Sequence, residues 1–283
     1  MKIKVRPNIV YGILTGVSAM NTTREWKKYH QISLSSLKQL GFGVKSAMES
    51  RISAEVEFFT DYVLKQNGGS FDPRDLVYLS TTNIIMNILF GRRHDYNLGM
   101  TELSYQIKRA FDSFDADLDV APVLRFLPSH RDRLRQQVES QMKIQEILCS
   151  EIEKSLEEDA GDCFVRRYLE RVGVDYDVEQ LRFTLRDLVG AATDTTANAL
   201  LWTLIALANN PDVQNRIRAE IDAVVPRDRL PSINDQPKLP FVDATILEIL
   251  RWKSLVPLAL PHMTLSDTNV GDYFVPAGTL VTR

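Results

Sequence analysis

Cysteine and histidine are scarce in this sequence, which argues against several kinds of metal site. Two cysteines, Cys149 and Cys163, occur in 283 residues, and neither belongs to a Cys-x-x-Cys pattern. This usage suggests a reducing compartment or ordinary packing in a core. The histidines are scattered without the spacing of a zinc site: His30, His94, His130 and His262. We therefore predict no metal held by a cluster of protein ligands.

Long apolar runs, a strong charge of either sign and glycine-rich phosphate loops are also lacking. The longest apolar run, 197–208, is interrupted by Asn198 and Thr203 and is too short to span a bilayer. The charges at the N-terminus are not followed by an apolar run, so the N-terminus does not resemble a signal peptide. The net charge of −3 gives no indication of nucleic-acid binding. We expect a chain without an integral anchor and without a nucleic-acid partner.

The composition favours one mainly helical domain over residues 1–283. Hydrophobic residues make up 44% of the chain, which permits a sizeable core, and 25% of the residues are charged. Periodicity and capping residues predict helices at 25–40, 46–65, 73–90, 100–114, 129–158, 164–171, 187–210, 211–225 and 240–253. From Val256 onward, proline, glycine and β-branched residues predict short strands at 268–275 and 279–281. The predicted fold class is mainly α with a small β-sheet region near the C-terminus.

The stretch 187–210 is the most informative part of the sequence. It contains no proline and is rich in alanine and leucine, and its second half is apolar almost all round, as in a buried helix. A polar group, Thr193-Asp194-Thr195-Thr196, interrupts it, and buried carboxyls and hydroxyls are costly unless something satisfies them. Helical spacing places Thr195 on one face with Leu188, Ala191, Ala192 and Ala199. Such small side chains leave room for a flat ligand, and an acid next to an alcohol can relay protons.

Two simpler interpretations of this polar group remain open. Thr193 or Asp194 could be the N-cap of a helix that starts after a short break. Alternatively, the Thr195 hydroxyl could bond back to a carbonyl of its own helix.

A second candidate site lies further along the chain. Glu248 and Arg251 are three residues apart on a predicted helix, with Ala244 and Leu247 on the same side, which would favour a buried pair. The simpler alternative is a surface ion pair that contributes little. An apolar segment bounded by prolines follows and ends at His262. A lone histidine of this kind is usually structural rather than a ligand.

The order of these motifs resembles the haem-thiolate monooxygenases of the cytochrome P450 family. The residues that carry the resemblance are Ala191-Ala192-Thr193-Asp194-Thr195-Thr196, Glu248-x-x-Arg251, Pro261-His262 and the run 271–279. Trp26 followed four residues later by His30 is similar to the Trp-x-x-x-Arg helix of that family, and the runs 90–96 and 127–131 also have counterparts. The resemblance covers essentially the whole chain and is closest to the microsomal animal enzymes that oxidise drugs, steroids and fatty acids.

The resemblance implies a haem (iron protoporphyrin IX), an apolar small-molecule substrate and electrons from NADPH through a reductase. It implies an endoplasmic reticulum membrane location for the full-length parent protein. Thr195 and Asp194 would be catalytic and deliver protons during oxygen activation, with Asp194 as the link to solvent. The remaining roles would be haem contact by Trp26, His30, Ala191, Ala192 and His262, a structural ion pair of Glu248 with Arg251, and a substrate pocket that includes Leu188, Val256 and Leu260.

The sequence departs from the family pattern at three points. Ala192 stands where the family usually has glycine, and His30 replaces an arginine, which would make its contact with a haem propionate depend on pH. The haem-ligating cysteine of the family lies in a loop of the form Phe-x-x-Gly-x-Arg-x-Cys-x-Gly, beyond the last strand predicted here, and neither Cys149 nor Cys163 has that context. The chain therefore resembles an internal piece of a longer monooxygenase that is inactive alone. The alternative is a truncated, catalytically dead helical domain with a binding or regulatory role.

Overall fold

The computed structural model describes residues 3–4, 24–94, 101–114, 118, 121–157, 161–173, 177–257, 259 and 262–281. The α-helices in this part of the chain are α1 (Arg24–Gln39), α2 (Lys45–Lys65), α3 (Arg74–Phe90), α4 (Glu102–Asp112), α6 (Pro128–Glu157), α7 (Phe164–Val172), α8 (Val178–Asn209), α9 (Pro211–Val224) and α10 (Pro240–Trp252). Two 3₁₀ helices, η2 (Pro122–Phe126) and η3 (Ile233–Lys238), connect some of them. The mainly helical fold predicted from the sequence is confirmed, and η3 is an element that the sequence did not predict.

Capping residues explain several of the helix boundaries. The Asp72 carboxylate accepts a hydrogen bond of 3.0 Å from the backbone N–H of Arg74, which satisfies the first turn of α3. This helix ends at Gly91, whose φ of 71° is the left-handed conformation that favours glycine. The first turn of α10 is capped from another helix, because the Glu220 carboxylate of α9 accepts hydrogen bonds from the backbone of Phe241 and Val242.

Helix α8 is longer than the stretch that first identified it. Its 32 residues begin at Val178, where the Asp177 carboxylate accepts hydrogen bonds from the backbone of Glu179 and Gln180. The helix continues without a break through Thr193 and Thr196. The interpretation of the polar group as a helix start is therefore wrong, because the N-cap lies sixteen residues before Thr193.

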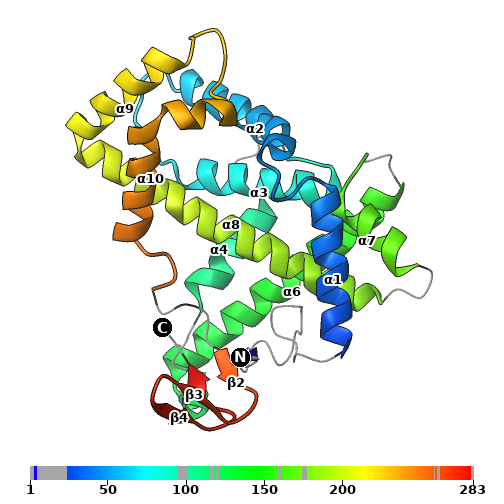
Figure 1. Cartoon of the computed structure of the whole chain (residues 1–283). Coiled ribbons are helices and arrows are strands. Elements are labelled where there is room, and N and C mark those ends of the chain that lie inside the picture. The colour runs from blue at the N-terminus through cyan, green and yellow to red at the C-terminus, as the bar shows by residue number, and fades with distance from the viewer. Residues whose placement is uncertain are drawn as a thin grey trace.

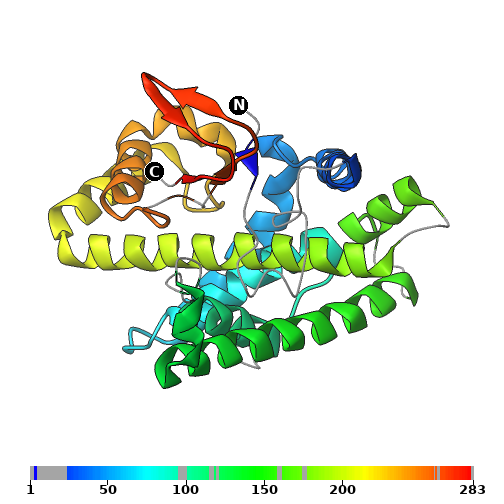
Figure 2. The ribbon, with the colours of Figure 1, turned by 90° about the horizontal axis from the view of Figure 1, so that it is seen from below.

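The other elements are arranged around α8, which runs through the middle of the molecule (Figure 1). Helices α3, α4 and α6 pack against it. Seen from below, α4 and α6 lie on one side of α8, whereas α1, α10 and the strands lie on the other (Figure 2). The two sides of α8 therefore have different surroundings, and this difference determines where a site can form.

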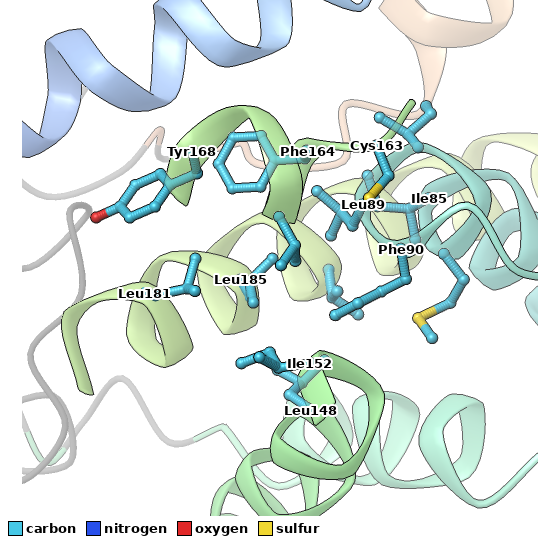
Figure 3. Packing of buried hydrophobic residues seen from close by; sticks show 14 of the residues in the cluster. Ile85, Leu89, Phe90, Leu148, Ile152, Cys163, Phe164, Tyr168, Leu181 and Leu185 are labelled. Carbon is cyan, nitrogen blue, oxygen red and sulfur yellow. The ribbon is translucent and has the colours of Figure 1, made fainter. Parts of the chain in front are cut away.

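The main core lies at the first half of α8. Leu181 and Leu185 of α8 meet Leu148 and Ile152 of α6, and residues of α3 and α7 close the cluster (Figure 3). Phe90, Phe164, Leu148, Leu181 and Leu185 are fully buried. Burial of each such side chain contributes about 1.5–3 kcal/mol. Cys163 is a fully buried member of the same cluster, in agreement with the use of cysteine as an ordinary core residue.

The second half of α8 is less buried than its sequence predicts. Leu200, Leu204 and Ile205 are 44%, 42% and 45% exposed. The apolar character of this half therefore does not correspond to complete burial in the described part of the chain. Ala197 and Leu201 pack with Val77, Tyr78 and Phe59, but Leu200, Leu204 and Ile205 stay exposed. In the same part of the chain, no helix combines the length and the apolar character needed to cross a membrane.

Two small antiparallel sheets complete the described structure. One has the strand order β1 (Ile3–Lys4), β2 (His262–Thr264) and β5 (Leu280–Val281), with His262 opposite Val281. The other pairs β3 (Thr268–Val270) with β4 (Tyr273–Val275). The stretch predicted as one strand, 268–275, is a hairpin because Gly271, with φ of 60°, turns the chain. Strand β2 was not predicted, since three residues give too little alternation to be identified.

Candidate active site

The four polar residues on α8 point in different directions. Thr193 is fully buried, as are Val189 and Ala197 one turn before and after it, and these three residues mark the side of the helix that faces the core. Residues that are two apart on an α-helix lie about 200° apart around its axis. Thr195 consequently lies on the side opposite Thr193, where Ala191 is also located and is exposed.

The Thr195 hydroxyl already has one hydrogen-bond partner. Its Oγ1 donates to the backbone carbonyl of Ala191 at 2.7 Å. The simpler interpretation, a threonine that bonds back to its own helix, is thus present in the structure. A hydroxyl that donates one bond can still accept others, so this bond leaves the lone pairs of Thr195 available to a donor. The residue is partly exposed.

The small side chains near Thr195 do not all share its surroundings. Ala191 is exposed, whereas Ala192 is half-buried and packs against the main core, as does Leu188. Among the predicted contacts of a flat ligand on α8, the structure therefore joins Ala191 directly to Thr195 and turns Ala192 partly toward the core.

Asp194 is bound to a residue that the sequence did not single out. Its Oδ1 accepts a hydrogen bond of 2.6 Å from the hydroxyl of Tyr78, which comes from α3 and is only 3% exposed. Burial raises the pKa of Asp194 above its ordinary value, against the opposing effect of the Tyr78 hydrogen bond. Burial also raises the pKa of Tyr78, and the hydrogen bond to Asp194 adds to this effect.

Asn198 extends this arrangement by one helical turn. Its Nδ2 donates to the backbone carbonyl of Asp194 at 3.0 Å and to the Tyr78 hydroxyl at 3.4 Å. Tyr78 and Asn198 are functional candidates that sequence reasoning missed. Tyr78 precedes Asp194 by 116 positions, and no local pattern in the sequence links two residues so far apart.

The predicted haem contacts outside α8 come from two elements. On α1, the rings of Trp26 and His30 stack with their centroids 4.6 Å apart and their planes at 18°. His262 lies on β2 and is partly exposed. Figure 2 shows α1 and the strands on the same side of α8. The four-residue spacing of Trp26 and His30 thus brings these two together. A shared haem contact of this pair with His262 stays a prediction.

Glu248 and Arg251 form the ion pair expected from their spacing. Arg251 donates to both carboxylate oxygens of Glu248, at 2.6 and 2.7 Å. The two side chains are 60% and 71% exposed, so the expectation of a buried pair is not met in this chain. The hydrogen bond to Arg251 lowers the pKa of Glu248. Glu248 also borders a largely apolar hollow of about 610 Å³ between α8, α9 and α10.

The predicted substrate-pocket residues are only partly described. Leu188 is half-buried on α8, and Val256, just after α10, is 45% exposed. Leu260 lies outside the described residues. A pocket formed by these three residues stays a prediction.

The side of α8 that carries Ala191 fits the edge of a flat prosthetic group better than it fits a metal ion alone. An exposed alanine and a partly exposed threonine leave the helix accessible there. Within the described ranges, no group of three or more histidine, cysteine, aspartate or glutamate residues could hold a metal. Cys163 is buried in the main core, and Cys149 lies on α6.

Comparison with known proteins identifies the family of the chain. The model of the Cytochrome P450 family matches residues 7–282. The chain belongs to the cytochrome P450 family. It is 31% identical over 276 residues to Cytochrome P450 2U1 of Rattus norvegicus, a match that covers 90% of this chain and 51% of the rat protein.

Other relatives belong to the same group of animal cytochromes P450. The chain is 29% identical to Cytochrome P450 2C5 of Oryctolagus cuniculus and 33% identical to Cytochrome P450 2E1 of Mesocricetus auratus. Each match covers 92% of this chain and 55% of the relative. The chain thus spans about half the length of the curated relatives it matches, and the resemblance to microsomal animal cytochromes P450 is confirmed.

Proposed function

We propose that the full-length parent of this chain is a haem-dependent monooxygenase that inserts one oxygen atom into an apolar small molecule. A xenobiotic, a steroid or a fatty acid is the expected class of substrate. Electrons come from NADPH through a reductase, and the parent protein resides at the endoplasmic reticulum membrane. The observation that carries the proposal is the partly exposed Thr195 beside Ala191 on the long central helix, in a chain that matches the cytochrome P450 family over nearly its whole length.

The haem would activate oxygen, and the residues of this chain would hold the haem and supply protons. Trp26, His30 and His262 would bind its propionates from α1 and β2, while Ala191 and the exposed part of Ala192 would border it. The Thr195 hydroxyl, which donates to the Ala191 carbonyl, would be the group that supplies protons at this site. Glu248 and Arg251 would stabilise the fold of the haem-binding region.

The substrate would be bound by apolar side chains near this site. Leu188, Val256 and Leu260 are the proposed lining, and such pockets are mostly apolar with few polar groups. The reductase would dock through complementary charge on α1, where Lys27, Lys28 and Lys38 are exposed.

The decisive experiment starts from the transcript that encodes the chain. The parent protein, expressed with a microsomal reductase, should bind haem with a thiolate-type carbon-monoxide spectrum. It should also oxidise at least one member of a panel containing a xenobiotic, a steroid and a fatty acid. A genuine stop codon directly after Arg283 would instead favour the second candidate, a catalytically dead helical domain with a binding role.

A further inference from the structure

Tyr78 and Asp194 connect α3 to α8 at the polar group of the candidate site. The Tyr78 hydroxyl donates to Asp194 Oδ1 at 2.6 Å, and the side-chain amide of Asn198 donates to the same hydroxyl at 3.4 Å. Asp194 is half-buried, so its carboxylate depends on protein groups for much of its solvation. The hydrogen bond from the buried Tyr78 to this carboxylate is therefore stronger than a hydrogen bond at the surface, where water can replace the donor.

The position of the Tyr78 hydroxyl is determined by packing. The ring belongs to a small buried cluster with Val77 and Ala197, and Phe59 and Leu201 pack against this cluster. Ala197 has a small side chain, which lets the ring of Tyr78 approach α8. Because α3 and α8 pack together closely, the hydroxyl cannot follow the carboxylate if Asp194 changes its rotamer.

We infer that Tyr78 is a positioning residue that holds the Asp194 carboxylate on the α3 side of α8, apart from the Thr195 hydroxyl. The inference rests on the proposed function, in which Asp194 and Thr195 handle protons. Neighbouring residues on a helix lie about 100° apart, and here the two polar groups bond to different partners, Tyr78 and the Ala191 carbonyl. Proton transfer between them then requires Asp194 to leave Tyr78 or a water molecule to bridge the two side chains.

Among the described residues, the charged groups that act on Asp194 are Asp112 and Lys108 of α4, which pair with each other. The uncharged Tyr78 and Asn198 face Asp194 from α3 and α8. Asp112 raises the pKa of Asp194 and Lys108 lowers it, and both effects are smaller than those of burial and of the Tyr78 bond. Removal of the Tyr78 hydroxyl should consequently dominate any change in the titration of Asp194.

The test is the titration of Asp194 in the 283-residue chain, followed by NMR of ¹³C-labelled aspartate carboxyls. The signal is assigned by its loss in Asp194→Asn. In Tyr78→Phe the pKa of Asp194 should rise, because a donor to the ionised form is lost while the aromatic ring remains. Tyr168→Phe is the matched control, since Tyr168 is also a buried tyrosine but lies on α7. An unchanged titration in Tyr78→Phe, or an equal shift in Tyr168→Phe, would overturn the inference.

A second variant keeps the inference testable if Tyr78→Phe does not fold. In Asp194→Asn, Tyr78 should ionise at lower pH in an ultraviolet alkaline titration, because the negative acceptor is gone. An unchanged Tyr78 titration would count against the inference. Neither measurement needs haem, so a parent protein without haem binding would sink the proposed function and leave the positioning role of Tyr78 standing.

Discussion

Single residues on α8 decide which groups can meet at the candidate site. Thr195 and Asp194 are neighbours in the sequence, yet one bonds to the carbonyl of Ala191 and the other to Tyr78 of α3. The hydrogen bond from Thr195 to the Ala191 carbonyl does not by itself indicate a function, because other threonine hydroxyls in helices make the same bond. Its functional interpretation depends on the partly exposed location and on the family to which the chain belongs.

Thr195→Ala in the parent protein should uncouple oxygen consumption from product formation by a large factor while haem binding persists. General acid–base groups typically contribute about 10²–10⁴-fold, and the reaction would lose its proton donor. Oxygen uptake, peroxide release and product are measured together. Thr203→Ala is the control, because the Thr203 hydroxyl makes the same type of bond, 2.8 Å to the Ala199 carbonyl, about two turns further along. Unchanged coupling in Thr195→Ala would return Thr195 to a structural role.

Asp194 and Asp235 should contribute to stability with opposite pH dependence. The folded pKa of Asp194 is raised by burial, so its contribution is present at low pH and is lost as the pH rises through that folded value. Asp194→Asn should therefore gain stability relative to the wild type as the pH is raised. The Arg229 hydrogen bonds lower the pKa of Asp235 to about 2, so its contribution is present above its unfolded pKa and is lost on acidification.

Urea unfolding between about pH 3 and pH 8 measures both effects, since this range includes the ordinary carboxyl pKa values. The difference between Asp194→Asn and the wild type should grow toward high pH, whereas Asp235→Asn should be destabilised most at high pH. If both variants shifted stability in the same direction at pH 8, the assigned environment of Asp194 would be wrong.

At the scale of elements, α8 owes its stability to one side of its first half. Leu181, Leu185, Val189 and Thr193 are buried there, whereas Leu200, Leu204 and Ile205 of the second half are exposed. The ion pair of Glu248 with Arg251 on α10 is likewise exposed, and an exposed pair contributes little to the stability of this chain. Any role of this pair in stabilising the core belongs to the full-length parent.

Leu185→Ala should destabilise the 283-residue chain by about 2–5 kcal/mol, because it leaves a cavity in the main core. Leu200→Ala changes the same residue type on the same helix, where the side chain is 44% exposed, and should change stability by about 0.5 kcal/mol or less. Thermal or urea unfolding compares the two variants. Equal losses would show that the second half of α8 is covered in solution.

At the scale of the whole molecule, α8 has different elements on its two sides, with α4 and α6 on one side and α1 and the strands on the other (Figure 2). Cys149 lies on α6, and Cys163 is buried in the main core directly before α7. An axial thiolate pushes electron density into the bond between the oxygen atoms. Because Cys163 is in the core and Cys149 lies on α6, we expect neither cysteine to provide such a ligand.

The 283-residue chain alone should bind haem weakly or not at all and should show no monooxygenase turnover. Any bound haem should give a reduced carbon-monoxide spectrum of the nitrogen-ligated or weakly ligated type. Titration with haem, followed by reduction under carbon monoxide, measures this directly. A thiolate-type spectrum that disappears in Cys149→Ser or Cys163→Ser would contradict the expectation and identify the ligand.

The sequence by itself determined the helices, the caps and the motif order that places the chain in its family. These features depend on local spacing, as in Glu248 with Arg251 and Trp26 with His30, because residues three or four apart always meet on a helix. The tertiary structure decided what each motif residue faces. Tyr78 bonds to Asp194 and Ala192 turns toward the core because helices distant in sequence pack against those positions. Glu248 stays exposed because no described helix covers it. Burial depends on such packing, and no local pattern in the chain encodes it.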